Sequence, residues 1–183
     1  MIRILFLAAV SLTRPTCAST KCARIDAADQ ERRFVLIPEF DAAADQLQDL
    51  LFRHRPQIVH FSGHGAQGGL FFKDANGQSR LVAPQTLRDL LAGFQTTVRC
   101  VVLNACYSQT QAEAIAAVID SVVGMSEALT DDAARAFAAA FYRALIHGAP
   151  LADAVALGRN QLDLQDLPEA HKPQLLAARV DAG

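Results

Sequence analysis

Short runs of apolar residues recur along the chain, and each is bounded by polar or turn-forming residues. Runs of this kind, rich in Val, Ile and Leu, are typical of strands that are buried on both faces of a parallel sheet. We expect Pro38 to stop its strand, because proline cannot donate a ladder hydrogen bond. The pattern predicts strands at Ile2–Ala9, Arg33–Pro38, Ile58–Ser62, Val98–Leu103, Ser121–Met125 and, as a last edge strand, Pro173–Arg179.

Amphipathic stretches lie between these strands. Asp41 is predicted to be the N-cap of a helix in which Leu47, Leu50 and Leu51 face the sheet, because their spacing of three and four places them on one side. Thr130, followed by two aspartates, is predicted to cap a long helix that runs to residues 147–148. The other helices are predicted over Pro84–Phe94, over Gln109–Ile119 and from Pro150 onward.

A glycine-rich loop, Gly63–Gly69, precedes a predicted β-hairpin. Its strands, Leu70–Phe72 and Arg80–Val82, flank the Asn76-Gly77 pair, which favours a tight hairpin turn. We expect this hairpin to lie beside the loop, outside the main sheet. Strands alternate with helices elsewhere, so the pattern predicts an α/β fold: a mainly parallel sheet with helices on both faces, which is a three-layer αβα sandwich, and a small β-hairpin excursion.

The first apolar run has two interpretations. With Arg3 near its start and Cys17-Ala-Ser after it, Ile2–Ala9 resembles a short signal peptide, which would indicate a secreted protein. A central parallel strand looks the same, and we favour the strand because the domain would otherwise lack its first one. Residues 10–20 are predicted to form a loop, and Cys22–Glu31 a short helix.

Composition narrows the class of protein. The chain has 183 residues with 51% hydrophobic and 20% charged, which indicates one globular domain over residues 1–183. The net charge is −2, and no cluster of Lys and Arg suggests a nucleic-acid partner. No apolar run is long enough to span a membrane. The four irregularly spaced cysteines form no disulfide framework, so we expect a cytoplasmic protein with reduced thiols.

Two candidate reactive side chains follow predicted strands. His64 comes after the third strand and Cys106 after the fourth, and ligands of such sheets bind outside the carboxyl ends of the strands. Cys106 also precedes a predicted helix, whose N-terminus favours a thiolate. His64 could then act as general base and acid. The backbone N–H groups of Gly65 and Cys106 could bind an oxyanion.

These and neighbouring residues also have structural interpretations. A lone cysteine after a strand is more often a small buried hydrophobe, and Cys100 is expected in the core. His60 and His64 have a spacing that binds metal on a helix, but the neighbouring glycines argue against a helix. His60 is therefore predicted to be a buried strand residue. Cys17 and Cys22 could pair or bind metal, but no second pair completes a zinc site, and we predict neither a metal nor a cofactor.

The motifs together resemble a known family. Val-His-Phe-Ser-Gly-His64-Gly, Val-Val-Leu-Asn-Ala-Cys106-Tyr-Ser and Val-Val-Gly-Met-Ser126 occur in the order found in the CHAT domain, the bacterial branch of the caspase-like cysteine peptidases. The resemblance extends to the first strand and to the helix after the fifth. It implies a caspase-like fold, a dyad of His64 as general acid and base with Cys106 as nucleophile, an acyl-enzyme on a peptide carbonyl, and an oxyanion site that includes the Gly65 N–H. The chain departs from the family at Thr16–Gln30, where relatives carry a longer, acidic helix.

In the caspase-like superfamily, the pocket for the residue before the scissile bond is partly built after the fifth strand. The acidic residues there are Glu127, Asp131 and Asp132, and one of them in the pocket would favour a basic residue before the scissile bond. Asp131 and Asp132 have the alternative role of stabilising a helix N-terminus, which leaves Glu127 as the better candidate.

Functionally, the resemblance implies a cysteine endopeptidase that cleaves a protein partner in bacterial signalling, antiphage defence or regulated cell death. We expect an activating sensor or protease to act on it in trans. The alternative is a caspase-like scaffold that binds a partner protein without cleaving it. The presence of both dyad residues favours the enzyme, because a scaffold needs neither.

Overall fold

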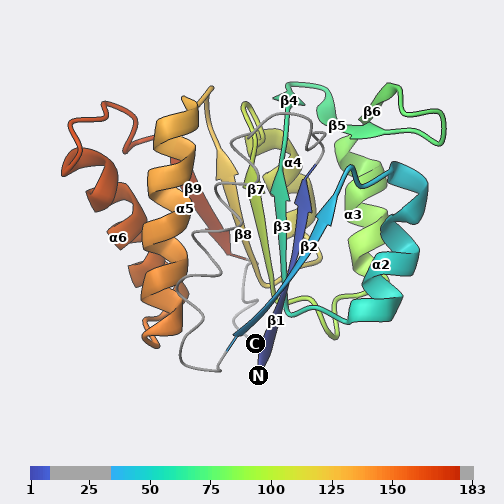
Figure 1. Cartoon of the computed structure of the whole chain (residues 1–183), viewed down its shortest axis with the longest axis horizontal. Helices are drawn as coiled ribbons and strands as arrows, with labels where there is room; N and C mark the ends of the chain where they lie inside the picture. The colour runs from blue at the N-terminus through green and yellow to red at the C-terminus, as the bar shows by residue number, and fades with distance from the viewer. Residues whose placement is uncertain (9–33, 178–183) are drawn as a thin grey trace.

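A six-stranded sheet forms the centre of the molecule in a computed structural model, which describes residues 1–8 and 34–177 (Figure 1). The strand order is β2-β1-β3-β7-β8-β9, and all neighbours pair in parallel except β9, which runs antiparallel to β8. The strands are β1 (Ile2–Ala8), β2 (Phe34–Phe40), β3 (Ile58–Ser62), β7 (Cys100–Asn104), β8 (Ser121–Met125) and β9 (Pro173–Ala177). The mainly parallel sheet predicted from the sequence is therefore confirmed.

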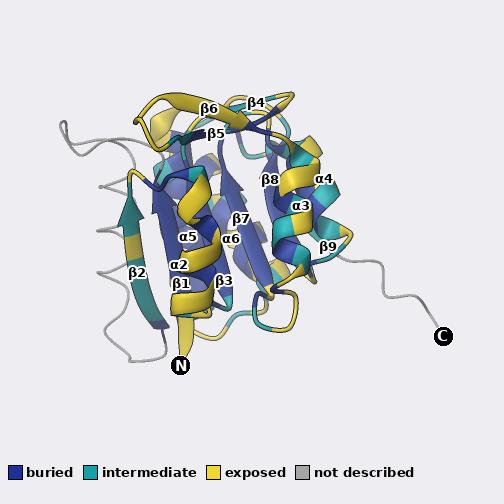
Figure 2. Ribbon diagram, turned by 90° about the vertical axis from the view of Figure 1, so that its right-hand side faces the viewer, coloured by how far each residue is buried: buried dark blue, intermediate teal, exposed yellow. Residues whose placement is uncertain are grey.

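Helices cover both faces of this sheet. One layer holds α2 (Leu47–His54), α3 (Pro84–Ala92) and α4 (Gln109–Ala116), and the other holds α5 (Asp131–Ile146) and α6 (Leu151–Asp163) (Figure 1). A short 3-10 helix, η1 (Ala44–Gln46), precedes α2. Each helical layer packs on the sheet through its own apolar cluster. Figure 2 shows the buried central strands behind α2 and α3, whose outer faces are exposed, and the half-buried edge strand β2. The predicted three-layer αβα arrangement is confirmed.

Strand β1 shows why the first run of the chain is continuously apolar. It lies between β2 and β3, and Ile4–Ala8 are all buried. Ile4 and Phe6 belong to the cluster under α5 and α6, whereas Leu5 and Leu7 belong to the cluster under α2, α3 and α4. Both faces of a central strand need apolar side chains, so the alternation expected of a half-exposed strand disappears. The interpretation of this run as a strand is confirmed.

A small second sheet stands at the carboxyl end of β3 (Figure 1). It contains β4 (Gly65–Ala66), β5 (Gly69–Lys73) and β6 (Ser79–Val82), paired antiparallel. In the turn between β5 and β6, the Asp74 carboxylate accepts hydrogen bonds from the N–H groups of Asn76 and Gln78, and Gly77 has a φ of 75°. The predicted hairpin excursion outside the main sheet is confirmed.

Two local predictions were wrong. Pro38 lies inside β2 and does not end it, because β2 is an edge strand on which a missing N–H leaves no partner strand unpaired. Asp41 caps no helix: it sits in a turn with a φ of 55°, and η1 begins after Ala43. There the Gln46 side chain accepts a hydrogen bond from the Ala43 N–H at 3.4 Å.

The C-terminal half follows the predicted caps more closely. Thr130 is the N-cap of α5, and its hydroxyl oxygen accepts a hydrogen bond from the Ala133 N–H.

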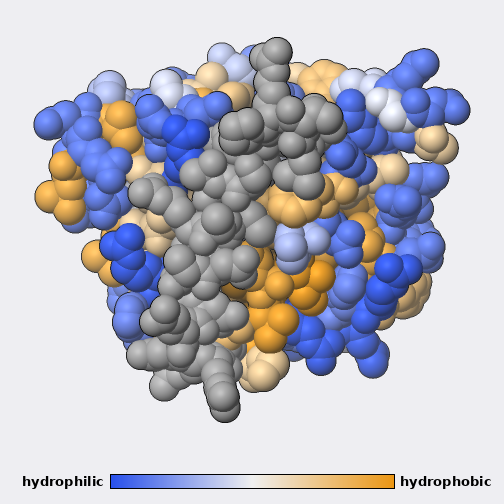
Figure 3. Space-filling view, in the orientation of Figure 1, coloured by the Kyte–Doolittle hydropathy of each residue, from blue (hydrophilic) through white to orange (hydrophobic). Residues whose placement is uncertain are grey.

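Gly158 of α6 packs on the Phe137 ring of α5, where a Cβ would approach two ring carbons to 2.7 Å. In the view of Figure 1, apolar side chains gather near the middle of the face, and hydrophilic ones predominate toward both edges, with single apolar side chains among them (Figure 3).

The described part of the chain contains no helix with the length and apolar character needed to cross a membrane. Several predictions lie outside the described residues: the loop over residues 10–20, the helix at Cys22–Glu31, the roles of Cys17 and Cys22, and the outer ends of the strands predicted to reach Ala9, Arg33 and Arg179.

Candidate active site

The two candidate reactive residues follow neighbouring strands. β3 and β7 pair in parallel, and their last residues, Ser62 and Asn104, are partners in the register. His64 lies two residues beyond β3, and Cys106 two residues beyond β7. Both therefore leave the sheet at the same edge and on adjacent strands. His64 is exposed and Cys106 is half-buried, so solvent reaches this edge.

The backbone after His64 packs directly on the backbone of Cys106. A Cβ placed on Gly65 would collide with the Cys106 carbonyl oxygen and would lie 3.3 Å from the Ala105 Cβ. Only glycine allows two backbone segments to approach this closely. The histidine turn and the cysteine turn are thus in contact, which strand order alone does not guarantee.

Strand β4 orients the residue after the histidine. The Phe71 N–H donates to the His64 carbonyl oxygen at 3.0 Å, which makes His64 and Phe71 a hydrogen-bonded pair of the antiparallel ladder. Hydrogen-bonded and non-hydrogen-bonded pairs alternate along such a ladder, so Gly65 and Leu70 form a non-hydrogen-bonded pair. The Gly65 N–H therefore points away from β5.

The turn that carries Cys106 is conformationally unusual. Tyr107 has a φ of 53°, in the left-handed region that non-glycine residues seldom occupy, and its side chain is 44% exposed. Its N–H donates to the Glu127 carbonyl oxygen at 3.5 Å. The Cys106 thiol donates to the Leu129 carbonyl oxygen with an S···O distance of 3.9 Å. The loop between β8 and α5, residues 126–130, therefore borders the thiol.

Ser108 connects the turn that carries Cys106 to the sheet by hydrogen bonds. It is fully buried at the N-cap of α4. Its hydroxyl donates to the Leu103 carbonyl oxygen at 2.9 Å and accepts from the Met125 N–H at 3.0 Å. The Ser108 side chain thus links β7 and β8 by hydrogen bonds, two residues after Cys106 in the sequence. No local sequence signal predicts this role of Ser108, because it depends on the pairing of β7 with β8.

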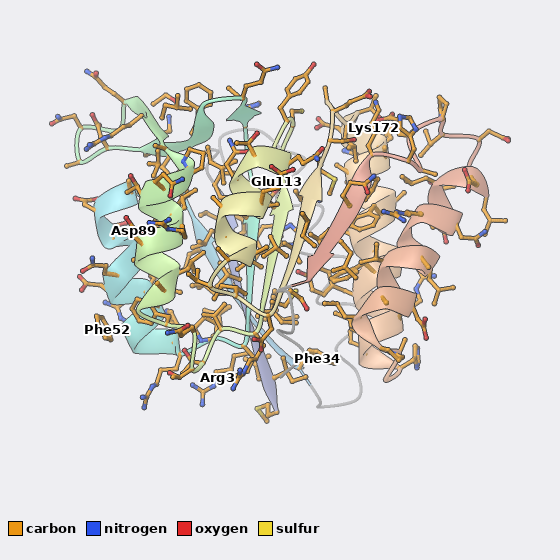
Figure 4. All side chains as sticks on the ribbon, turned by 180° about the vertical axis from the view of Figure 1, so that it is seen from behind. Arg3, Phe34, Phe52, Asp89, Glu113 and Lys172 are labelled. Carbon is orange, nitrogen blue, oxygen red and sulfur yellow. The ribbon has the colours of Figure 1, made fainter. Side chains whose placement is uncertain are left out.

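The loop over residues 126–130 is also held from its other side. The buried Glu169 carboxylate accepts hydrogen bonds from the Thr130 hydroxyl at 2.7 Å and the Thr130 N–H at 2.9 Å. The Lys172 ammonium donates to the Ala128 carbonyl oxygen at 2.6 Å and lies 3.4 Å from Glu169. In Figure 4, Lys172 lies at the opposite end of the molecule from Arg3 of β1, at the carboxyl end of the parallel strands.

The contacts with Thr130 and Lys172 change the pKa of the Glu169 carboxyl group. Burial raises the pKa of Glu169, but the hydrogen bonds from Thr130 and the nearby Lys172 charge outweigh burial and hold the pKa below its usual value. Glu169 is 39 residues from Thr130, so no local sequence signal predicts the contact. Glu169 and Lys172 thus hold the loop over residues 126–130 through Thr130 and Ala128.

The three acidic candidates for a substrate pocket lie around this loop. Glu127 is exposed, and one of its carboxylate oxygens is 3.9 Å from the His171 imidazole. Asp131 and Asp132 occupy the first turn of α5, where their charge favours the helix, and Asp132 forms an ion pair with Arg135. The Glu127 carbonyl oxygen accepts the hydrogen bond from the Tyr107 N–H, which connects Glu127 to the turn that carries Cys106.

The other histidine and cysteine of the neighbouring strands belong to the core. His60 is buried in β3, shares a hydrogen bond of 2.8 Å with the Tyr142 hydroxyl and stacks on Phe6. Burial raises the pKa of Cys100 to about 12. Both predictions of core positions are confirmed. Within residues 1–8 and 34–177, no three His, Cys, Asp or Glu side chains gather as a potential metal site.

Comparison with known proteins gives three findings. The family model described as CHAT domain matches residues 14–179. A Roc-COR-CHAT protease from an unknown prokaryotic organism is 27% identical over 111 residues, covering 57% of this chain and 10% of the relative. A probable protease from Gillisia limnaea is 26% identical over 113 residues, covering 60% of this chain and 20% of the relative. The chain thus matches only a small part of either relative.

Among solved structures, the Drosophila initiator caspase Dronc superposes with a TM-score of 0.55 at 13% sequence identity, covering 86% of this chain and 71% of the caspase. This similarity shows that the αβα sandwich with its mainly parallel sheet has a caspase-like fold, as predicted from the sequence.

Proposed function

The chain belongs to the CHAT domain family, and on that premise we propose that it is a cysteine endopeptidase that cleaves a protein partner with Cys106 and His64. The observation that carries the proposal is the contact between the turn after His64 and the backbone of Cys106, at the carboxyl ends of paired strands. The protease names of the two relatives support the same class of reaction.

The reaction needs one nucleophile and one group that moves protons. His64 takes the proton of the Cys106 thiol, and the sulfur attacks the carbonyl carbon of the scissile peptide bond. The tetrahedral intermediate collapses when His64 gives that proton to the leaving amine, which leaves a thioester on Cys106. Water then attacks the thioester, His64 accepts its proton and returns it to the thiolate, and the new carboxyl product departs.

Two backbone N–H groups are proposed to bind the oxyanion, those of Gly65 and Cys106. The ladder geometry supports Gly65, because its N–H points away from β5 and is not used in the hairpin pairing. Its closeness to the Cys106 backbone supports a shared site for one oxygen. Backbone donors of this kind stabilise the charge that develops in the transition state and contribute about 3–4 kcal/mol each.

For substrate choice, we propose that Glu127 favours a basic residue before the scissile bond. The support is its place in the loop that borders the thiol, together with its exposed carboxylate. Asp131 and Asp132 are weaker candidates, because the first turn of α5 gives both a structural role. By resemblance to the family, we further propose action in the cytoplasm in signalling, antiphage defence or regulated cell death, with activation by a sensor or protease in trans.

The test compares the wild-type chain with Cys106→Ala and His64→Ala. The proteins are incubated with a proteome-derived peptide library and new N-termini are identified by mass spectrometry. We expect both variants to lose cleavage while their thermal unfolding matches wild type. His147→Ala, an exposed histidine that follows α5, is the matched control and should cleave normally.

Cleavage that persists in either dyad variant would contradict the assignment. A thiol-reactive peptide electrophile separates the enzyme from the scaffold alternative, because it needs no natural substrate. Labelling of Cys106 that depends on His64 supports the enzyme. Equal labelling in wild type and His64→Ala, with no cleaved peptides from either, would instead favour a protein that binds its partner without cutting it.

A further inference from the structure

One buried amide joins the two turns of the candidate site. Gln111 lies in the first half of α4 and is fully buried. Its side-chain Nε2 donates a hydrogen bond to the Ala66 carbonyl oxygen at 2.8 Å, across 45 residues of sequence. Ala66 belongs to β4, whose other residue is Gly65.

The two ends of this hydrogen bond lead directly to the proposed dyad. On one side, α4 follows Cys106 through its N-cap, Ser108, which places Gln111 five residues after the cysteine. On the other side, Ala66 is separated from His64 only by Gly65. The backbone contact between Gly65 and Cys106 lies between these ends. Gln111 therefore connects the turn that carries Cys106 to the turn that carries His64.

The surroundings of Gln111 favour an apolar residue. Its helix neighbours Ala112 and Ile115 are buried in the apolar cluster under this face of the sheet. Its Oε1 atom accepts no hydrogen bond from any described residue, and a buried acceptor in that state lowers stability. Exchanging the oxygen and nitrogen would place two acceptors against each other at Ala66, so the donor assignment stands. The contact with Ala66 is thus the one favourable polar interaction that the side chain makes among the described residues.

We propose that Gln111 is a positioning residue that holds the His64–Gly65 turn against Cys106. It touches neither substrate nor the reacting atoms; it acts through Ala66 and β4. The effect on catalysis rests on the proposed peptidase function, whereas the effect on the position of the turn does not. Without it, no other hydrogen bond among the described residues joins α4 to β4, and the imidazole and the oxyanion donor lose their fixed distance to the thiol.

The first test is Gln111→Leu, which keeps the size of the side chain and removes its donor. We expect kcat to fall about 10- to 100-fold, because misplacement of catalytic groups by a fraction of an ångström to 1 Å has effects of this order. KM should change less than kcat, since the lost alignment is needed in the transition state. Gln109→Leu is the matched control: this glutamine is in the same helix and pairs with the exposed Glu113.

The second test uses Gln111→Glu and pH. A buried carboxyl group has a raised pKa, and only its protonated form can donate to the Ala66 carbonyl oxygen. The activity of this variant relative to wild type should therefore rise as pH falls from about 8 to about 6, whereas the relative activity of Gln111→Leu should stay flat. If both variants show the same pH dependence, donation to the Ala66 carbonyl oxygen does not affect activity, and the proposal is overturned.

Hydrogen–deuterium exchange tests the position of the turn without any substrate. Peptides that cover residues 64–71 should exchange faster in Gln111→Leu than in wild type or Gln109→Leu. Unchanged exchange there, in a folded variant, overturns the proposal whatever the activity shows. If wild type cleaves no peptide, the peptidase function fails, and the exchange result still decides the role of Gln111. If Gln111→Leu does not fold, the exchange of residues 64–71 in Gln111→Glu at the two pH values decides.

Discussion

The approach of Gly65 to Cys106 leads to a sharp prediction for Gly65→Ala. The added Cβ would collide with the Cys106 carbonyl oxygen, well inside the 3.0 Å that real Cβ atoms keep from other groups. The Ala105 and Leu70 side chains, each 3.3 Å from the same Cβ, close the directions in which it could be accommodated. One of the two backbone turns therefore has to move.

The required movement is of the order of 1 Å, and a displacement of that size near reacting groups lowers the rate about 100-fold. In free energy this is about 2.7 kcal/mol of lost transition-state stabilisation. Overpacking is expected to lower the unfolding free energy by about 1–3 kcal/mol, so the variant should remain folded at room temperature. The measurements are kcat/KM on a cleaved peptide and the midpoint of urea unfolding.

Gly68→Ala is the matched control in the same loop. A Cβ at this position meets only the end of the Leu81 side chain, at 3.4 Å, and the residue has no positive φ. We expect its activity to stay within about threefold of wild type. If Gly65→Ala were equally active, the close contact of the two turns would have no part in catalysis, and the proposed geometry of the site would be wrong.

Four further predictions concern separate parts of the molecule. A thiol reagent at about pH 7 should modify Cys106 and spare Cys100, because burial raises the Cys100 pKa to about 12; peptide mapping assigns the labelled thiol, and prompt modification of Cys100 would contradict its burial. Glu169→Gln should lower the unfolding free energy by about 1–3 kcal/mol at neutral pH. Because the pKa of Glu169 is lowered in the folded state, the difference in unfolding free energy between wild type and variant should be complete above the unfolded-state pKa of about 4.3. It should vanish as pH falls through the folded-state pKa. Urea unfolding across pH measures this difference, and a difference that does not change with pH would contradict the prediction. Gly158→Ala should destabilise the protein by about 1–3 kcal/mol through the clash with the Phe137 ring but leave kcat of the folded enzyme unchanged, which unfolding and activity assays check in parallel. Glu127→Gln should reduce the preference for Arg or Lys before the scissile bond in a peptide library, whereas Asp132→Asn should not; equal profiles would remove Glu127 from the pocket.

The local pattern of apolar and turn-forming residues predicts most helices and strands correctly. It fails for residues whose role depends on where their element lies in the tertiary structure. The bounds of β3 and β8 match the prediction, because continuous apolar runs between turn residues have few other interpretations. The prediction for Pro38 is wrong because whether proline ends a strand depends on whether that strand is at an edge, and edge position is a property of the sheet. The prediction for Asp41 is wrong because an aspartate suits a left-handed turn as well as a helix N-cap.

The same division holds at the candidate site. His64 and Cys106 could be placed at strand ends from the sequence, and parallel strands bring their carboxyl ends to one edge. The order of the strands, with β3 directly beside β7, and the contact of Gly65 with Cys106 came only from the structure. Gln111 gave no signal, because a single glutamine in a short amphipathic helix is usually a surface residue.

The sequence by itself determined the class of fold, the candidate reactive residues and the family resemblance, because periodicity, strand ends and short motifs are local properties of the chain. The tertiary structure decided which distant groups support them. Gln111 meets Ala66 across 45 residues, and Glu169 meets Thr130 across 39. Hydrogen bonds between such groups depend on how the whole sheet and its helices pack, and no local pattern encodes that packing.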